Sequence, residues 1–252
     1  MPIYNGSVEQ GDLYYGGTKI KEAYYGSTLV YQSIQPGFVV GEYTSSGTYT
    51  ASVPSSGVYE ITAVGAGGGT VAAVGGDGKY GACTCAAGGS GGYVVARFNL
   101  SSGQQLNITV GAKGGDRTDV CLKSGGTLTH YITCDDGGAS SVISNGTTLV
   151  TANGGGGGYT NNTYNNNYYS SPRAGTGGTV SVNSSGTTVS SASGNNGTAS
   201  HAGWDASVSV TGGASKYNGY GKASSGRAWP PTGTSTDGTG TGGYIKIVYV
   251  SR

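Results

Sequence analysis

Two glycine runs restrict this sequence more than any other feature. Residues 65–69 are Gly-Ala-Gly-Gly-Gly, and residues 154–158 are five consecutive glycines. Glycine loses more backbone entropy on folding than any other residue and has no side chain to pack, so such runs do not form a stable helix. A β-strand pattern precedes each run, at 58–64 and at 148–152. This repetition favours ordered glycine tracts inserted between the strands of a β-sandwich.

The overall composition indicates a folded chain in spite of its 52 glycines among 252 residues. Disordered chains combine high net charge with few aromatic residues. Here the net charge is +1, charged residues make up 10%, and there are 20 tyrosines. Because no basic patch occurs, we expect no nucleic-acid partner. Because no apolar run approaches the ~20 residues that span a bilayer, we expect no membrane insertion.

The first residues, Met-Pro-Ile-Tyr-Asn-Gly, resemble no secretion signal, since they have neither a basic region nor an apolar region. We therefore expect a protein that is made in a host cytoplasm. Lysis, with the protein built into a virus particle, is a release route that needs no signal.

A short repeat opens the chain. Residues 14–20, Tyr-Tyr-Gly-Gly-Thr-Lys-Ile, recur as Tyr-Tyr-Gly-Ser-Thr-Leu-Val at 24–30, and each copy has a two-residue turn signal between β-forming residues. The pattern predicts a three-stranded β-meander too small to be very stable alone, which is either a decorative N-terminal hairpin or a docking module. Gln35-Pro36-Gly37 breaks the pattern. We therefore expect two domains, a tyrosine-rich module at 1–35 and a glycine-rich sandwich at 36–252.

The second domain has strand patterns and no convincing helical period, which predicts an all-β fold. An Asn-Gly pair at 145–146 separates two strand patterns, as in a tight hairpin. The expected strands are 41–53 (interrupted by a turn at 45–47), 58–64, 93–100, 105–110, 139–144, 147–152 and 243–250. Pairing of the terminal strands would bring 41–64 beside 243–250.

The succession of these segments resembles a known type of domain. It is carried by Tyr59–Gly69, Gly88–Gly92, Ser102–Gly111, Leu149–Gly158 and Gly242–Ile247. Together they are similar to the glycine-rich domains of bacteriophage tail-fibre and adhesin proteins, and to the glycine-rich domain of the anaplastic lymphoma kinase receptor family. The resemblance implies a jelly-roll-like sandwich that carries polyglycine II helices packed side by side.

Physical chemistry supports such tracts. A helix of this kind has three residues per turn and no internal hydrogen bonds, so its N–H and C=O groups must pair with neighbouring helices. We therefore expect the tracts 65–69 and 154–158 to lie close together. A Gly156→Val substitution is then expected to be strongly destabilising.

Two tyrosine-rich stretches are the candidate binding loops, 159–171 and 214–231. Tyrosine combined with asparagine, serine and glycine is typical of antibody binding loops, and aromatic faces suit sugar rings. We expect both loops at the end of the sandwich from which the glycine tracts emerge. The candidate receptor-binding residues are Tyr159, Tyr164, Asn166, Tyr168, Tyr169, Tyr217, Tyr220 and Trp229. Solvated surface loops are the plainer alternative.

Signatures of catalysis are missing, so we expect no enzyme, no cofactor and no metal. The two histidines, His130 and His201, have no evident partner in sequence, and no nucleophile or phosphate-binding motif occurs. The acidic pair Asp135-Asp136 precedes two glycines and is interpreted as a turn. Of the cysteines, Cys83 and Cys85 form a C-x-C pair that cannot easily close on itself, whereas Cys121 and Cys134 flank a possible hairpin and could form a disulfide. Free buried thiols are the first interpretation of the four cysteines, with a disulfide and then a metal site as the alternatives.

Two classes of function remain. The first is a receptor-binding component of a phage virion that recognises a glycan or protein of the bacterial surface. The second is a purely structural virion or surface-filament protein. In either case we expect the 1–35 module to contact other virion proteins, and we expect a homo-oligomer.

Overall fold

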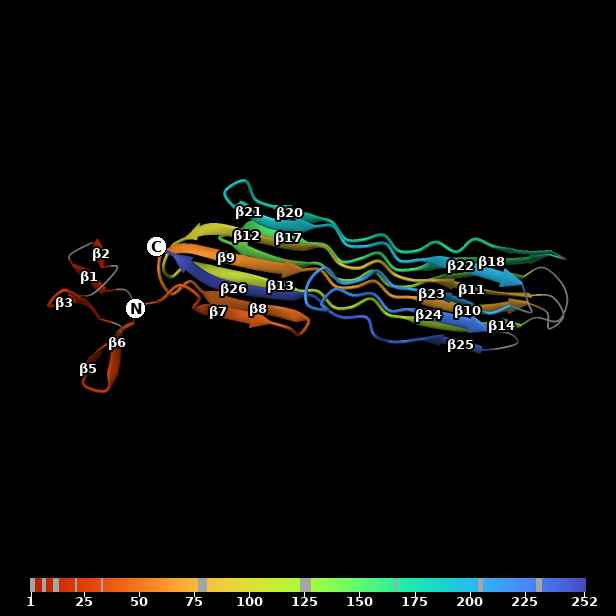
Figure 1. Cartoon of the computed structure of the whole chain (residues 1–252), viewed down its shortest axis with the longest axis horizontal. Helices are drawn as coiled ribbons and strands as arrows, with labels where there is room; N and C mark the ends of the chain where they lie inside the picture. The colour runs from red at the N-terminus through yellow and green to blue at the C-terminus, as the bar shows by residue number, and fades with distance from the viewer. Residues whose placement is uncertain are drawn as a thin grey trace.

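The structure is a computed structural model. Figure 1 shows a long, narrow molecule in which four parts follow one another, and every regular element described is a β-strand, which confirms the all-β fold. N-terminal hairpins stand at one end, followed by a β-sandwich, a bundle of extended glycine-rich segments (the glycine bundle) and a second group of sheets (the head) at the far end. The described residues are 3–5, 8–10, 14–20, 22–32, 34–76, 81–122, 128–165, 167–203, 206–229 and 233–252.

The N-terminal part forms three two-stranded hairpins. Both turns predicted from the repeat are present, with positive φ angles at Gly16 (57°), Gly17 (82°) and Gly26 (61°). The predicted three-stranded meander is wrong, because each described strand here pairs only within its own hairpin. The pairs are β1 (Ile3–Asn5) with β2 (Val8–Gln10), β3 (Tyr14–Tyr15) with β4 (Thr18–Lys19), and β5 (Glu22–Tyr25) with β6 (Thr28–Gln32).

The sandwich consists of two five-stranded antiparallel sheets. The first has the order β21 (Thr187–Ala192), β12 (Tyr93–Leu100), β9 (Gly57–Val64), β26 (Tyr244–Ser251), β7 (Val39–Tyr43). The second has the order β20 (Val180–Val182), β17 (Thr147–Ala152), β16 (Ser140–Ser144), β13 (Gln105–Val110), β8 (Gly47–Ser52). As expected, the C-terminal strand pairs with both β7 and β9.

Apolar side chains fill the space between the two sheets. On β13, Leu106, Ile108 and Val110 are buried and alternate with exposed polar residues, as the sequence period predicts. They pack against Ile61 and Ile247 of the opposite sheet. This half of the molecule is therefore held by an ordinary hydrophobic core.

The glycine bundle joins the sandwich to the head. Within segment 65–70, backbone N–H groups three residues apart donate to the same neighbouring segment, which is the geometry of a polyglycine II helix. The bonds run from Gly65 and Gly68 to segment 87–92 (both 2.9 Å), from Ala66 and Gly69 to segment 134–139 (both 3.0 Å), and from Gly67 to segment 237–243 (3.1 Å).

The two glycine runs lie side by side, as predicted. Gly155 N–H donates to the Ala66 carbonyl and Gly158 N–H to the Gly69 carbonyl, each at 2.9 Å. A Cβ built at Gly155 would overlap the carbonyl oxygen of Gly89, whereas one built at Gly156 would meet nothing closer than the Thr176 nitrogen at 3.2 Å. A Cβ at Gly154, Gly157 or Gly158 would also overlap a backbone carbonyl, so Gly156 is the one position of this run with room for a methyl group.

Serine, threonine and asparagine do not exclude the later segments from the bundle. Gly194 and Gly197 lie three residues apart, and a Cβ at either would overlap the backbone oxygen of Ser90 or Ala87. The intervening Asn196 is exposed. A peripheral segment therefore needs glycine only where it faces inward, once per turn of three residues.

The acidic pair lies in the bundle rather than in a turn. The Asp136 carboxylate accepts a hydrogen bond from Gly157 N–H at 2.7 Å, and the Asp135 carbonyl accepts the bond from Gly69. Nearby, the Asp116 carboxylate accepts from the backbone of Thr70 and from the Ser224 hydroxyl, both at 2.8 Å. These side chains satisfy backbone donors where the bundle passes into the head.

The head has three layers. A central sheet has the order β14 (Arg117–Leu122), β10 (Val71–Gly76), β11 (Gly81–Ala86), β22 (Ala199–Gly203). The two flanking sheets are β15 (Leu128–Thr133), β18 (Tyr159–Asn165), β19 (Asn167–Ser170), and β23 (Val208–Val210), β24 (Gly226–Trp229), β25 (Gly233–Thr236). Small side chains fill the two thin cores between the layers.

The cysteines belong mainly to these thin cores. Cys83, Cys85 and Cys134 are buried free thiols, as the first interpretation had it, and Cys134 forms no disulfide. The predicted hairpin between Cys121 and Cys134 is wrong, because β14 and β15 belong to different sheets. Burial raises the pKa of the Cys85 and Cys134 thiols to about 12.

No helix long and apolar enough to cross a membrane occurs in the described part of the chain.

Candidate functional site

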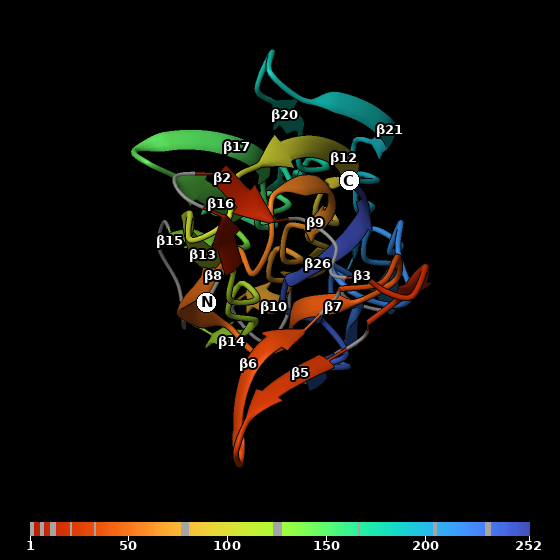
Figure 2. The same ribbon diagram turned by 90° about the vertical axis from the view of Figure 1, so that its left-hand side faces the viewer.

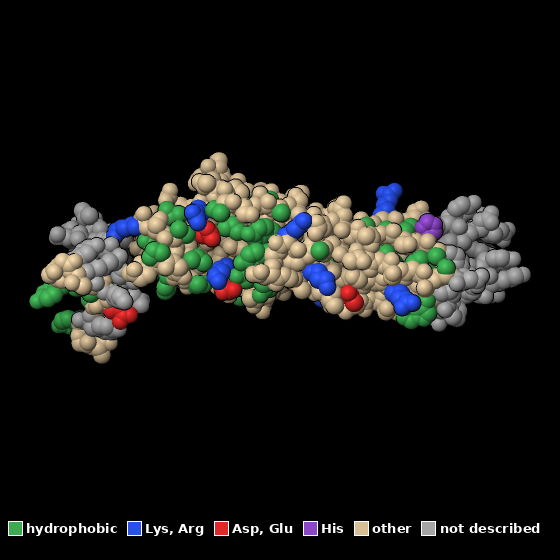
Figure 3. All heavy atoms as spheres, in the orientation of Figure 1, with side chains coloured by type: hydrophobic (Ala, Val, Ile, Leu, Met, Phe, Trp, Pro, Cys, Tyr) green, Lys and Arg blue, Asp and Glu red, His purple; other side chains and the backbone are tan. Residues whose placement is uncertain are grey.

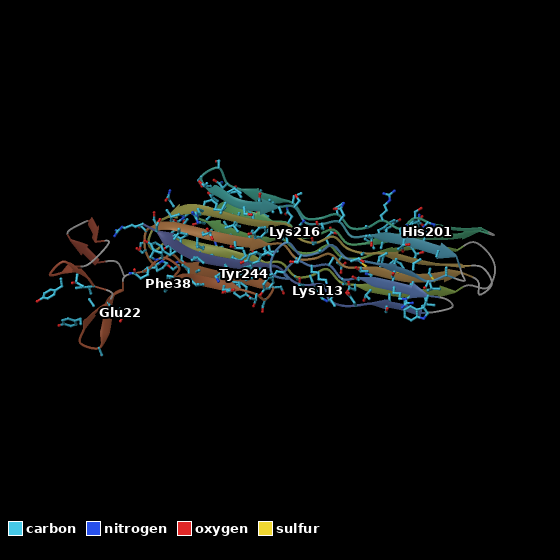
Figure 4. The ribbon with its side chains drawn as sticks, in the orientation of Figure 1. Glu22, Phe38, Lys113, His201, Lys216 and Tyr244 are labelled. Carbon is cyan, nitrogen blue, oxygen red and sulfur yellow. The ribbon has the colours of Figure 1, made fainter. Side chains whose placement is uncertain are left out.

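The predicted binding residues fall into two groups at opposite ends of the glycine bundle, so the expectation of one common site is wrong. Tyr217 and Tyr220 lie where the bundle leaves the sandwich, whereas Tyr159 and Trp229 belong to head strands. Figure 4 shows the same division, with Lys216 toward the sandwich end of the bundle and His201 in the head.

The turn at 216–221 has a local cause. Asn218 and Gly219 both have positive φ angles, 45° and 83°, and the Ser215 hydroxyl accepts from Tyr217 N–H (3.1 Å) and donates to the Tyr220 carbonyl (2.6 Å). An Asn-Gly pair favours this geometry. The same signal was used at 145–146, and at 218–219 it could have predicted a tight turn in place of an open loop.

The tyrosines of this turn pack against the sandwich. Tyr217 stacks on Tyr93 with ring centroids 5.1 Å apart, and Tyr220 stacks on Tyr244 at 4.5 Å. We call these four residues the junction cluster. Stacked aromatic pairs add stability beyond the area they bury. Tyr217 and Tyr220 are therefore packing residues of the junction rather than free side chains of a binding loop.

A partly buried hydrogen bond links the junction cluster to the edge of the first sheet. Tyr244, which is 3% exposed, donates from its hydroxyl to Glu42 at 2.8 Å, and Lys246 forms an ion pair with the same carboxylate at 3.2 Å. Burial and then this bond raise the pKa of the Tyr244 phenol, and the bonds from Tyr244 and Lys246 lower the pKa of Glu42. The geometry is that of a structural joint.

The second predicted loop, 159–171, is mostly a β-hairpin. Strands β18 and β19 pair in antiparallel register, with Tyr164 opposite Tyr168 and Thr163 opposite Tyr169. Tyr159 is half-buried at the start of β18 and pairs through its backbone with Arg173. Asn166 lies outside the described residues.

Trp229 is the predicted site residue with the clearest surface position. On β24, Gly226 and Ala228 are buried, whereas Arg227 and Trp229 point outward, and the indole is 39% exposed. The Arg227 guanidinium lies 5.6 Å from the centre of the Trp229 ring, within cation–π range. The result is an aromatic ring with a fixed cation beside it.

The neighbouring strand leaves room for the indole. Gly233 pairs with Trp229 across the β24–β25 hairpin, and a Cβ built at Gly233 would overlap the Trp229 ring. Ser209 and Ser235 pair with Arg227 in the same sheet. The outer face of this sheet therefore combines one aromatic ring, five guanidinium N–H donors and small hydroxyls, which suits a sugar or another polar ligand with a flat apolar face. We call Arg227 and Trp229 the Trp229 platform.

A further exposed aromatic residue was missed. Tyr131 on β15 is 61% exposed, while its neighbours Ile132 and Cys134 are buried. The alternation Tyr131-Ile-Thr-Cys134 is a half-buried strand pattern, and it could have placed this tyrosine on the surface. It lies on the opposite outer layer from the Trp229 platform.

The Trp229 platform and Tyr131 both belong to strands of the head, which forms the far end of the molecule. The described ends of β10, β18 and β24, and the starts of β11, β19 and β25, lie together there, opposite the N-terminal hairpins (Figure 1). In Figure 3, lysine, arginine and acidic side chains are scattered along the molecule rather than gathered into a patch of one sign. A partner recognised by charge alone does not fit this face.

Comparison with known proteins gave one finding. The family model described as a glycine-rich domain matches residues 44–251, which cover the sandwich from β8 onward, the bundle and the head. No curated protein matches the chain.

Proposed function

Since this chain belongs to the family of glycine-rich domains, we propose that it is the receptor-binding component of a bacteriophage tail fibre, with the head as the part that contacts the bacterial surface. The proposal extends the resemblance to phage tail-fibre and adhesin proteins that the glycine tracts carry. The single observation that supports it most is the separation of the molecule into a hairpin module at one end and an aromatic-bearing head at the other (Figure 1).

The glycine bundle suits the role of a spacer. Its interior N–H and C=O groups pair between neighbouring segments, so its rigidity does not depend on side chains. A stiff spacer holds the head away from the particle at a fixed orientation. A flexible linker of the same length would let the head sample many orientations, and binding would then cost conformational entropy.

The chemistry of the Trp229 platform favours a surface glycan as the receptor. A sugar ring can stack on the exposed indole while its hydroxyl or acidic groups accept hydrogen bonds from Arg227. The chain carries a net charge of +1, so specificity would rest on this local geometry rather than on the overall field.

The test is adsorption of particles that carry Trp229→Ala or Arg227→Ala. Truncation of an interface aromatic or arginine at a binding hot spot costs about 2 kcal/mol or more, so we expect a fall in adsorption of roughly tenfold or more with unchanged assembly. The matched control is Val189→Ala on strand β21 of the sandwich, where the side chain is 50% exposed. Normal adsorption of both platform variants would contradict the proposed platform, and loss of assembly would favour the purely structural function.

A further inference from the structure

The indole of Trp229 lies flat on the neighbouring strand. A Cβ built at Gly233 would meet the ring atoms Cδ2, Cε2 and Nε1 of Trp229, which include the bond shared by the two rings. One face of the indole therefore covers the Gly233 backbone, and since Trp229 is 39% exposed, the other face is turned to solvent. A tryptophan fixed in this way presents a large, flat apolar surface on which a sugar ring can stack.

Arg227 places a cation at the side of that ring. Its guanidinium carbon lies 5.6 Å from the ring centre, beyond the ~3.5–4.0 Å of direct carbon contact, so it does not cover the middle of the indole. On β24 the two residues alternate with buried ones, so both side chains point to the same side of the sheet. One ligand can therefore contact the ring and the cation together.

This sheet provides no carboxylate for the guanidinium. The described strands β23, β24 and β25 contain no aspartate or glutamate, and Ser209 and Ser235 are the residues that pair with Arg227. The carboxylate of Asp237, which follows β25, accepts two backbone N–H groups, at 2.9 and 3.0 Å. Within the described ranges no ion pair involves Arg227. An anionic ligand would thus meet this cation without displacing an acidic side chain of these strands.

The platform faces sideways from the molecule. The strands of the head run along its long axis, so the outer face of the sheet β23–β24–β25 points away from that axis (Figure 1). Figure 2, which looks along the long axis from the hairpin end, has the strands of the sandwich in front of the head. A lateral face is accessible to the internal units of a long chain. The position therefore suits a polysaccharide that runs alongside the head.

We propose that the Trp229 platform binds an acidic sugar, with the sugar ring stacked on the outer face of the indole and its carboxylate held by Arg227. In a uronic acid the carboxylate is bonded directly to a ring carbon and projects from the rim of the ring, so stacking directs it sideways toward the cation. The guanidinium fork matches a carboxylate in bidentate geometry. A neutral sugar gains only the stacking.

This inference rests on the proposed function, which makes the bacterial surface the source of the sugar, and it names the chemical class of that sugar. A phosphorylated sugar carries its charge through an intervening oxygen, farther from the ring, and fits the pair less well. The internal units of an acidic polysaccharide repeat the same carboxylate along the chain, which matches a face that is open along its side.

Fluorescence titration of the full-length protein tests the inference. The chain has two tryptophans, so in a Trp204→Phe variant the tryptophan emission comes from Trp229 alone. The ligands are oligosaccharides of galacturonate, glucuronate and mannuronate, each compared with the same oligosaccharide after reduction of its carboxylates to alcohols. We expect at least one acidic ligand to bind about tenfold or more tightly than its reduced counterpart, since a hydrogen bond to a charged group contributes about that factor. Calorimetry with the unsubstituted protein repeats the comparison.

Variants assign the preference to its residues. Arg227→Gln should remove the preference for the acidic ligand and leave the affinity for the reduced ligand unchanged, whereas Trp229→Ala should weaken both. The matched control is Arg173→Gln, because Arg173 is an exposed arginine that follows β19, and both affinities should stay at the parent values. The preference of the parent should also shrink as the ionic strength rises, because salt screens an exposed charge pair.

Three results overturn the inference: every acidic ligand binds no more tightly than its reduced counterpart, Arg227→Gln keeps the preference, or a phosphorylated mannan binds more tightly than all three uronates. Failure of the proposed function is a separate result. Particles with Trp229→Ala would then adsorb normally, whichever sugar the purified protein prefers.

Discussion

The sandwich and the glycine bundle are two solutions to the same problem of holding extended segments together. In the sandwich, large side chains such as Ile61 and Leu106 fill the space between two sheets. In the bundle, the segments approach so closely that backbone carbonyls occupy the space where a Cβ would be. The sandwich core is therefore apolar and tolerant of some shape change, whereas the bundle interior is held by backbone hydrogen bonds and does not accept a side chain at glycines such as Gly155.

The largest effect is expected from Gly155→Val in the bundle. Its side chain would overlap the Gly89 carbonyl, and the backbone there cannot move without breaking bonds to several segments. Overpacking costs typically 1–3 kcal/mol and occasionally more, and we expect about 4 kcal/mol here. Chemical denaturation followed by tyrosine fluorescence measures it.

The neighbouring glycine supplies the matched control. Gly156→Ala places a methyl group 3.2 Å from the Thr176 nitrogen, a tight contact without backbone overlap. We expect a cost of about 1 kcal/mol, near the low end for overpacking. Equal losses at the two positions would show that the run is held loosely and would remove the contrast between bundle and sandwich.

The next largest loss of stability is expected from a substitution in the core of the sandwich. Leu106→Ala deletes a fully buried side chain from the core and leaves a cavity. Such truncations cost about 2–5 kcal/mol, and we expect about 3 because the site is enclosed by both sheets. Unfolding of the sandwich should precede loss of the bundle in this variant, as hydrogen exchange of the amides at 66–69 would reveal. Simultaneous exchange of both regions would show that they unfold as one unit.

A smaller effect is expected at the junction between the two regions. Tyr220→Ala removes the stacking on Tyr244, and aromatic pairs contribute about 0.5–1.5 kcal/mol beyond area burial. Tyr220→Phe keeps the ring and should be close to the parent in thermal unfolding. If Tyr220→Ala instead reduces adsorption at unchanged stability, the junction cluster has a binding role after all.

The smallest effect is the pH dependence of stability caused by a buried thiol in one of the thin cores of the head. Burial raises the pKa of Cys85 to about 12, so the folded state holds the thiol neutral while the unfolded chain ionises near its usual pKa of 9.0. The contribution of this thiol to the free energy of unfolding is thus fully present below pH 9 and decreases as the pH rises from 9 toward 12. The Cys85→Ala variant should lose less stability than the parent between pH 8 and 10. An identical loss in both would show that this thiol does not contribute.

The sequence by itself determined the all-β class, the strands of the sandwich other than β20 and β21, and the close pairing of the two glycine runs. These features depend on local signals: alternation of buried residues along β13, the Asn-Gly turn at 145–146, and runs in which no side chain competes with backbone pairing. Each signal acts within a few residues, so one chain without any structure was enough to identify them.

Only the tertiary structure decided which residues share a site. Tyr217 and Trp229 are twelve positions apart in one stretch of similar composition, yet segment 221–225 carries the chain the length of the bundle between them. Whether a tyrosine stacks in a joint or stands exposed depends on the neighbours that distant strands bring to it, as Tyr93 and Tyr244 do for Tyr217. Composition indicates which contacts a residue type can make. Long-range backbone pairing decides which neighbours a given residue has, and thus which of these contacts form.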